Sequence, residues 1–252
     1  MTYVEIDPRF ARLGNWMFQY AAAKTAAKGG PVTFVIERAK DREEFAKYAA
    51  LFPEPVVESA PAGADVRTEI YNDPRLVDAD MARRLYPVPG ERCDMVSIHV
   101  RRGDYMKCPE GFPFVGEDYL RRAVALFGEG RRFMVFSDDI PWCKRFFRGG
   151  QFAFSEGRSP LEDLYGIARC MDHISSNSTF SWWGAFLGPG GRTVFPSMWR
   201  GPFVPNQDWK SLYFPGSEVL HNEYSPALWR KAKWGMFRRK CRHALKKLEF
   251  WR

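Results

Sequence analysis

The stretch Asp94-Met-Val-Ser-Ile-His-Val-Arg-Arg-Gly-Asp104 decides the fold class that this sequence predicts. Residues 94–100 form a largely apolar run that is typical of a buried strand, and the charged residues after it mark the carboxyl end of that strand. Further strand-like runs lie at residues 2–6, 31–36, 133–136, 151–154, 173–175 and 193–195, and helix-like runs at 16–28, 117–127, 142–147, 160–171 and 179–187 alternate with them. This alternation predicts an α/β fold with parallel strands.

The chain has 252 residues, which is enough for one or two domains. We expect an N-terminal domain at residues 1–112, a second domain at residues 113–224 and a C-terminal tail at residues 225–252. Residues 38–86 are poorly patterned, with weak helical signals near 43–51 and 77–85, and we assign little structure to them.

The positive charge of the chain is concentrated in the tail. Ten of the 38 basic residues lie between Arg230 and Arg252, with Glu249 as the one acid, which leaves 28 basic and 29 acidic residues elsewhere. On a helix, one stripe would hold the apolar residues Phe237, Cys241, Ala244, Leu245, Leu248 and Trp251. The basic residues would lie outside this stripe: Arg238, Arg239, Arg242, Lys246 and Lys247. Such a helix is typical of a segment on an anionic membrane surface, but a helix packed on the body with a solvated basic face has the same pattern. The nearly neutral body argues against a nucleic-acid partner, because binding a phosphate backbone needs a basic face.

Composition excludes several other classes of protein. With 45% hydrophobic and 27% charged residues, the chain is neither disordered nor collagenous nor a coiled coil. Its five cysteines are scattered and odd in number, which indicates neither a disulfide framework nor a zinc site. The N-terminus has no signal-peptide pattern, and no apolar run approaches 18 residues. We therefore expect a cytoplasmic protein without a membrane span.

The densest group of reactive residues runs from His99 to Tyr105, where a strand ends. In open α/β sheets the ligand crevice lies beyond the carboxyl ends of the strands. The adjacent guanidinium groups of Arg101 and Arg102 are costly to bury without an anion, and the planar fork of arginine fits phosphate oxygens. We expect a phosphate or diphosphate ligand, with Asp104 orienting one arginine. The alternative is a structural ion pair between Arg102 and Asp104.

Two other polar segments follow predicted strands. The first segment consists of Ser176, Asn177, Ser178, Thr179, Phe180 and Ser181. Its hydroxyl and backbone N–H groups, at a predicted helix N-terminus, could bind an anion without a metal. The alternative is ordinary helix capping by Ser178 or Thr179. In the second segment, Asp138 and Asp139 could bind a divalent metal or accept hydrogen bonds from a base or a sugar. Asp78-Ala-Asp80 matches a DxD metal motif in form, but its position favours a helix N-terminus.

Together, these segments resemble glycosyltransferase family 11, the α-1,2-fucosyltransferases. Arg12–Ala21 (RLGNWMFQYA) is similar to the family's GLGNQMFQYA, and His99–Tyr105 is similar to its HxRRGDY. Phe136–Asp139 resembles its strand-end acidic pair, and Ile174–Trp183 resembles its second-domain signature. The resemblance extends over roughly residues 12–209 and includes Tyr71-Asn-Asp-Pro-Arg75, which looks like the family's YFQDPRYF.

The resemblance implies a fold of the GT-B type, with two facing Rossmann-like domains. Because residues 38–86 are short for the family, the N-terminal domain would be reduced. The donor would be GDP-β-L-fucose, without a metal or another cofactor. Arg101 and Arg102 would clamp the diphosphate opposite residues 176–181, and His99 with Asp138 or Asp139 would recognise guanine. Gly14, Asn15 and Trp16 would lie near the acceptor. The catalytic residues would be Asn15, Arg101, Arg102 and Asp104.

The implied reaction is an inverting transfer of L-fucose to the 2-hydroxyl of a galactoside in a bacterial surface polysaccharide or a lipid-linked glycan. Stabilisation of the leaving diphosphate would be the main contribution of the protein. The basic tail would hold such an enzyme at the inner membrane. Two alternatives stay open. One is another linkage or another GDP-sugar. The other is a nucleotide-sugar-binding protein without turnover, suggested by Trp16 in place of the family's Gln and by the short first domain.

Overall fold

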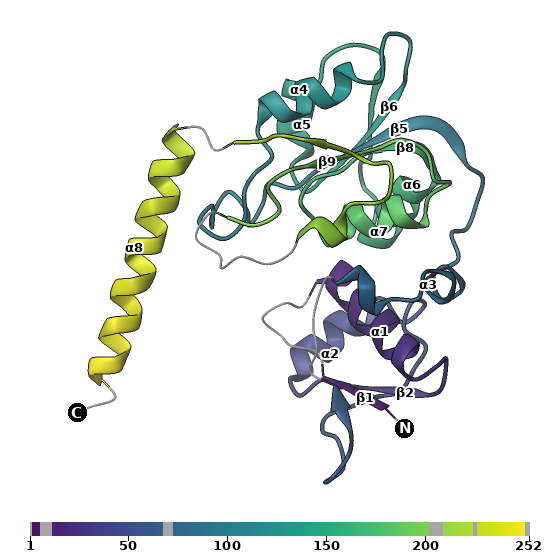
Figure 1. Cartoon of the computed structure of the whole chain (residues 1–252), viewed down its shortest axis with the longest axis vertical. Helices are drawn as coiled ribbons and strands as arrows, with labels where there is room; N and C mark the ends of the chain where they lie inside the picture. Colours follow the sequence, from purple (N-terminus) through teal and green to yellow (C-terminus); the bar gives the residue numbers. More distant parts are fainter. Residues whose placement is uncertain (1, 6–11, 68–72, 202–208, 224–225, 250–252) are drawn as a thin grey trace.

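The computed structural model describes residues 2–5, 12–67, 73–201, 209–223 and 226–249. It contains a four-stranded sheet of order β3-β2-β1-β4 and a six-stranded sheet of order β10-β9-β8-β5-β6-β7. All the strand pairs of the described residues are parallel. The smaller sheet lies in the lower half of the molecule and the larger sheet in the upper half (Figure 1). The predicted α/β fold with parallel strands is confirmed.

The lower half follows the predicted pattern where the sequence is periodic. Its elements are β1 (Thr2–Glu5), α1 (Leu13–Ala26), β2 (Val32–Val35), α2 (Ala39–Ala46), β3 (Val56–Val57), β4 (Val66–Arg67), the 3-10 helix η2 (Pro74–Leu76) and α3 (Ala79–Leu85). The strands β3 and β4 were not predicted, because two residues are too few to show alternation. The motif residues Ala11, Tyr71 and Asn72 lie outside the described residues.

The upper half is a regular series of strands and helices. Its elements are β5 (Cys93–Val100), α4 (Glu117–Ala125), β6 (Phe133–Ser137), α5 (Ile140–Phe146), β7 (Phe152–Phe154), α6 (Pro160–Arg169), β8 (Cys170–Ile174), α7 (Thr179–Leu187), β9 (Thr193–Pro196), η3 (Trp209–Leu212) and β10 (Glu218–Leu220). Local signals explain several helix starts. Ser159 and Glu162 form a capping box at α6, and Asp139 caps α5 by accepting a hydrogen bond from the N–H of Trp142 at 3.1 Å.

The two sheets divide between β4 and β5, earlier than the boundary expected after residue 112. In register, Ile98 of β5 pairs with Val135 of β6 on one side and with Ile174 of β8 on the other. The strand β5 takes this central place because residues 96–100 are all buried. A strand with such a run needs a paired strand on each edge and packed helices on each face of the sheet. The strand that leads into the His99–Tyr105 cluster is therefore the centre of the upper sheet.

The two halves meet where α1 crosses α7. A Cβ atom added to Gly14 would lie 2.7 Å from the backbone nitrogen of Phe180, so the helix starts can approach this closely only with glycine there. The Nε1–H of Trp183 donates a hydrogen bond to the carbonyl oxygen of Gly14 at 2.9 Å. The ring of Phe18 packs against those of Trp182 and Trp183, with centroids 4.6 and 4.8 Å apart. One continuous core thus joins both halves.

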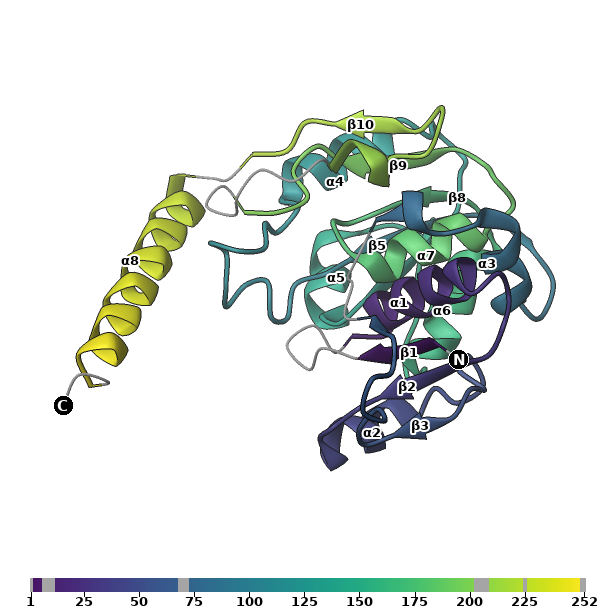
Figure 2. The same cartoon turned by 60° about the horizontal axis from the view of Figure 1, so that its bottom comes forward.

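Helix α8 (Pro226–Glu249) projects from the upper half, as Figure 1 and the turned view of Figure 2 both show. Its first turns contact the loop after β5. Ala232 is fully buried, and Lys231 Nζ donates a hydrogen bond to the carbonyl oxygen of Met106 at 2.8 Å. Farther along, Trp234 and Phe237 are 61% and 55% exposed. Within the described ranges, no helix is both long and apolar enough to cross a membrane.

Candidate active site

A cleft of about 590 Å³ lies between the two halves, at the carboxyl ends of the strands of the upper sheet. This is where the parallel-sheet rule predicts a ligand site. Many of the expected site residues line the cleft: Gly14, Asn15, His99, Arg101, Asp104, Asp138, Asn177, Ser178, Thr179 and Phe180. The expected residues outside its lining are Trp16, Arg102, Asp139, Ser176 and Ser181.

Arg101 is fixed in the cleft by two carboxylates. Its Nη2 atom lies 2.9 Å from Asp104 Oδ1, and its Nη1 atom lies 3.1 Å from Asp138 Oδ2. The second oxygen of Asp104 faces Arg12 Nη2 at 3.5 Å. A Cβ atom on Gly103 would lie 2.6 Å from Asp138 Oδ2, so a side chain there would displace the carboxylate that pairs with Arg101. The guanidinium of Arg101 is thus held in one orientation, as expected for a group that meets an anion.

His99 is buried beneath the cleft and neutral at physiological pH. Burial and the positive charge of Arg101 lower the pKa of His99 to about 3. Its Nδ1 atom lies 2.7 Å from Ser176 Oγ, which ties β5 to the segment after β8. A neutral ring in this place can exchange hydrogen bonds with a ligand but adds no positive charge.

The start of α7 borders the cleft through residues 177–180. Ser178 caps the helix by accepting a hydrogen bond from the N–H of Phe180 at 3.3 Å, and Thr179 Oγ1 donates one to Asn15 Oδ1 at 2.8 Å. Asn177 Oδ1 is buried without a hydrogen-bond partner among the described residues. Ser181 faces the interior, where its hydroxyl lies 2.8 Å from Ser175 Oγ. The predicted capping by Ser178 is confirmed, and residues 177–180 border the cleft.

Arg102 does not join Arg101 in the cleft, contrary to the expected clamp. Its guanidinium lies over the rings of Trp142 and Phe114, at 4.1 and 4.8 Å from their centroids. Its Nε donates a hydrogen bond to Asp139 Oδ2 at 2.9 Å, so the alternative of an Arg102–Asp104 ion pair is wrong. Although burial raises the pKa of Asp139, the hydrogen bonds from Arg102 and from the α5 backbone outweigh it and lower the pKa. Arg102 and Asp139 thus stabilise the fold beneath the site.

Trp16 also lies elsewhere than expected. Its side chain is 1% exposed and packs edge-on against Phe45, with ring centroids 5.1 Å apart, inside the lower half. It therefore faces the core instead of an acceptor. The reason is the rotation of α1, which turns Gly14 and Phe18 toward α7 and Trp16 toward α2.

Four charged residues of the cleft were not predicted from the sequence as site residues: Arg12, Arg158, Asp163 and Arg200. Asp163 Oδ1 accepts a hydrogen bond from Ser155 Oγ at 2.5 Å, and burial raises the pKa of Asp163. Arg158 lies after β7 and Arg200 after β9, so the strand-end rule that singled out Arg101 would have found both.

The residues that the structure describes hold no cluster of three or more His, Cys, Asp or Glu side chains that could bind a metal ion. Asp78 caps α3, where its Oδ1 accepts a hydrogen bond from the N–H of Met81 at 2.7 Å. The preference for a helix N-terminus over a DxD metal motif is confirmed at this position.

Residues 75–203 match the model of a known family, described as Glycosyl transferase family 11. The match covers half of the chain. This protein belongs to glycosyl transferase family 11. The resemblance inferred from the motifs is thus confirmed, and the matched residues of the family 11 chain include the strands β5 to β9 with Arg101, Asp138 and residues 176–181.

Relatives of the family 11 chain carry related names. It is 38% identical to an alpha-1,2-colitosyltransferase of Escherichia coli over 122 residues, which are 43% of this chain and 42% of that protein. It is 30% identical to the human galactoside alpha-(1,2)-fucosyltransferase 1 over 155 residues, which are 55% of this chain and 41% of that protein. The alignments span less than half of each relative. Among solved structures, the iron-containing dodecameric glycosyltransferase TibC of E. coli aligns with 89% of this chain and 63% of its own, at 14% identity and a TM-score of 0.46.

Proposed function

We propose that this family 11 protein is an inverting glycosyltransferase that moves L-fucose from GDP-β-L-fucose to the 2-hydroxyl of a galactoside, in the synthesis of a bacterial surface polysaccharide. The observation that carries the proposal is the cleft, in which Arg101 and the open start of α7 both face one space at the carboxyl edge of a parallel sheet. The family and the names of its α-1,2-transferring relatives support it. Two facing α/β halves, with a small N-terminal sheet, agree with a reduced GT-B architecture.

The guanine base would lie at the end of the cleft that follows β7. A carboxylate accepts hydrogen bonds from N1–H and the N2 amino group of guanine, and an arginine fork donates to O6 and N7. Asp163 in the first turn of α6 and Arg158 just before that helix offer these two groups, and both line the cleft. Asp138 suits this role less well than expected, because its oxygens already accept from the Arg102 N–H at 2.9 Å and pair with Arg101 at 3.1 Å.

The diphosphate would lie between Arg101 and the first turn of α7. In the transfer, the acceptor hydroxyl oxygen attacks the anomeric carbon and loses its proton to a base. The bond from that carbon to the diphosphate breaks, and its electron pair stays on the departing phosphate oxygen. Positive groups already oriented toward that oxygen stabilise the developing charge. Because both oxygens of Asp104 face guanidinium groups, we assign Asp104 the positioning of Arg101, and Asn15 the positioning of α7 through Thr179.

A product assay tests this function. The purified chain is incubated with GDP-fucose and lactose, with and without EDTA, and GDP release and product mass are measured. We expect a fucosylated product in both conditions, in keeping with a metal-independent reaction. Tight GDP binding without any product would favour another acceptor, another sugar donor or a binding protein. Activity that EDTA abolishes would overturn the metal-independent mechanism.

We further propose that α8 holds the protein on the anionic face of the inner membrane, close to lipid-linked acceptors. Trp234 and Phe237 stack on each other with centroids 5.6 Å apart and are exposed, which suits rings that insert at the level of lipid headgroups. The basic residues of the tail provide charge attraction to such a surface. Deletion of residues 225–252 should move the protein from the membrane fraction to the soluble fraction. Unchanged fractionation would refute this role of α8.

A further inference from the structure

The arginines of the cleft differ in how their charge is balanced. Arg101 meets the carboxylates of Asp104 and Asp138. In contrast, among the described residues no carboxylate lies within 4 Å of the guanidinium of Arg158 or Arg200, and neither group donates a hydrogen bond to them. A positively charged side chain that lines a cleft without a counter-ion can bind an anionic ligand.

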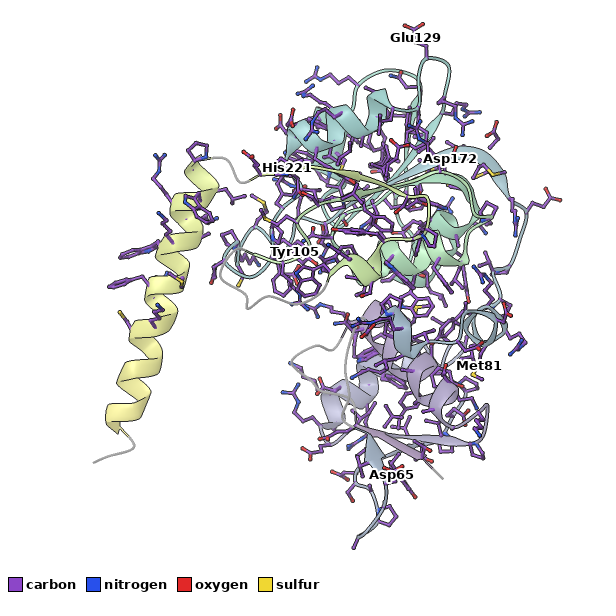
Figure 3. The ribbon with its side chains drawn as sticks, viewed as in Figure 1. Asp65, Met81, Tyr105, Glu129, Asp172 and His221 are labelled. Carbon is purple, nitrogen blue, oxygen red and sulfur yellow. The ribbon has the colours of Figure 1, made fainter. Side chains whose placement is uncertain are left out.

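Arg200 is the more enclosed of the two. Its guanidinium lies 5.2 Å from the centroid of the Phe112 ring and 5.6 Å from that of Trp209, and it is partly buried. Phe112 in turn stacks on Tyr105 with centroids 4.9 Å apart. Figure 3 labels Tyr105 on the loop after β5, on the side of the upper half toward α8. These rings fix the guanidinium and keep water from part of it, and the burial lowers the pKa of Arg200.

The sheet order separates Arg200 from the expected base end of the cleft. Arg200 follows β9 and Arg158 follows β7, with β8, β5 and β6 between them. Neighbouring strands are about 4.8 Å apart, so the two strand ends are separated by roughly 19 Å along the sheet edge. The strand before Arg101, β5, is two positions from β9 in the sheet, so the end of β9 lies on the side of β5 away from β7. With guanine near Asp163 and the diphosphate near Arg101, the acceptor would lie at the Arg200 end of the cleft.

We propose that Arg200 binds an anionic group of the acceptor, a carboxylate or a phosphate carried close to the accepting galactose, and that the cleft therefore selects acidic over neutral galactosides. This inference rests on the proposed function, since it needs a donor that occupies the other end of the cleft. The planar fork of arginine suits both anions, and the flanking rings of Phe112 and Trp209 hold it ready.

Matched acceptors test the inference. Lactobionate and lactitol both carry galactose on an open-chain sugar. Lactobionate has a carboxylate where lactitol has a hydroxymethyl group. Lactose 1-phosphate is an acceptor that carries a phosphate instead. We expect kcat/KM for lactobionate or lactose 1-phosphate to exceed that for lactitol at least tenfold, through a lower acceptor KM. The larger of the two effects identifies the anion. In Arg200→Gln the preference should vanish, and in Arg200→Lys it should be kept in part.

Binding measurements separate this inference from the proposed function. The GDP affinity of Arg200→Gln should equal that of the wild-type chain, and its melting temperature should be unchanged. Arg158→Gln, at the other end of the cleft, should weaken GDP binding but keep the acidic preference. If the chain shows no turnover, calorimetric titration of the GDP-saturated chain with lactobionate and with lactitol compares the affinities of the two sugars. Equal affinity for both sugars, or weaker GDP binding in Arg200→Gln, would overturn the acceptor role of Arg200.

Discussion

Thr179 Oγ1 donates a hydrogen bond to Asn15 Oδ1 at 2.8 Å, although 164 positions separate the two residues in the chain. The bond joins the start of α7 to the start of α1 at the cleft. Two helix starts that line one cleft from different halves of the molecule are held together by this bond without a charge.

The Asn15–Thr179 bond should couple the two halves energetically. A double-mutant cycle with Asn15→Ala and Thr179→Val should give a coupling energy of about 1 kcal/mol in urea unfolding, the usual size for one partly buried hydrogen bond. Thr179→Val should also lower kcat, because the start of α7 loses its fixed position. Thr179→Ser keeps the hydroxyl and serves as the control. Additive effects of the two substitutions would exclude this coupling.

Gly14 should tolerate no side chain. A Cβ atom there would lie 2.7 Å from backbone and side-chain atoms of Thr179 and from the nitrogen of Phe180, so Gly14→Ala must push α1 and α7 apart. We expect a loss of about 1–3 kcal/mol in the free energy of unfolding, as for an overpacked core, together with loss of activity. Gly150→Ala is the matched control, because a Cβ atom on Gly150 would meet nothing within 4 Å. Similar stability of both variants would contradict the close crossing.

Arg102 should contribute to stability and not to ligand binding. Arg102→Ala removes a guanidinium 4.1 Å from the Trp142 ring centroid together with its bond to Asp139, and we expect a loss of about 1–3 kcal/mol in urea unfolding. The GDP affinity of the folded variant should remain within about twofold of wild type. Arg121→Ala provides a comparison, because its guanidinium lies over Phe146 at 4.7 Å but its side chain is 67% exposed. That variant should lose less than about 0.5 kcal/mol.

The buried histidines should make the fold sensitive to mild acid. The pKa of His99 is lowered to about 3 by burial and by Arg101, and burial lowers the pKa of His173 to about 4. In the unfolded chain both pKa values are near 6.5, so between pH 6.5 and 4 the unfolded state binds protons that the folded state does not. The free energy of unfolding should therefore fall as the pH falls through this window, by at most about 1.4 kcal/mol per pH unit for each histidine.

Urea titrations at pH 7.5 and 5.0 measure this effect. His173→Gln should reduce the loss of stability between the two values, because its buried ring no longer titrates. Equal pH dependence in the wild-type chain and in His173→Gln would show that His173 does not cause it.

The sequence predicted those parts of the fold whose signals are local. The apolar run before Arg101 and the charged residues after it are enough to identify β5 and its carboxyl end. Periodicity identified α6, whereas the caps of α5 and α6 were recognised only in the structure. The strands β3 and β4 have only two residues each and show no periodicity. Their places depend on pairing with β2 and β1, which are distant in the chain.

The site was predicted less completely than the fold, because side-chain direction depends on long-range neighbours. Arg101 and Arg102 are adjacent and chemically equal, yet one faces the cleft and the other packs on Trp142, which comes forty positions later. Trp16 belongs to the same motif as Gly14, but the helix rotation that separates them is set by α2, in the poorly patterned region. Arg200 follows the predicted strand β9, so the strand-end rule could have identified it, but that rule was applied only to the polar segments after β5, β6 and β8.

Calorimetric titration of the chain with GDP measures whether the cleft around Arg101 binds a guanosine diphosphate sugar. We expect saturable binding at one site per chain, and at least tenfold weaker binding in Arg101→Ala at a temperature at which the variant is folded, with Arg121→Ala as the exposed-arginine control. An absence of saturable GDP binding by the wild-type chain, or the same affinity in Arg101→Ala, would exclude this role of Arg101.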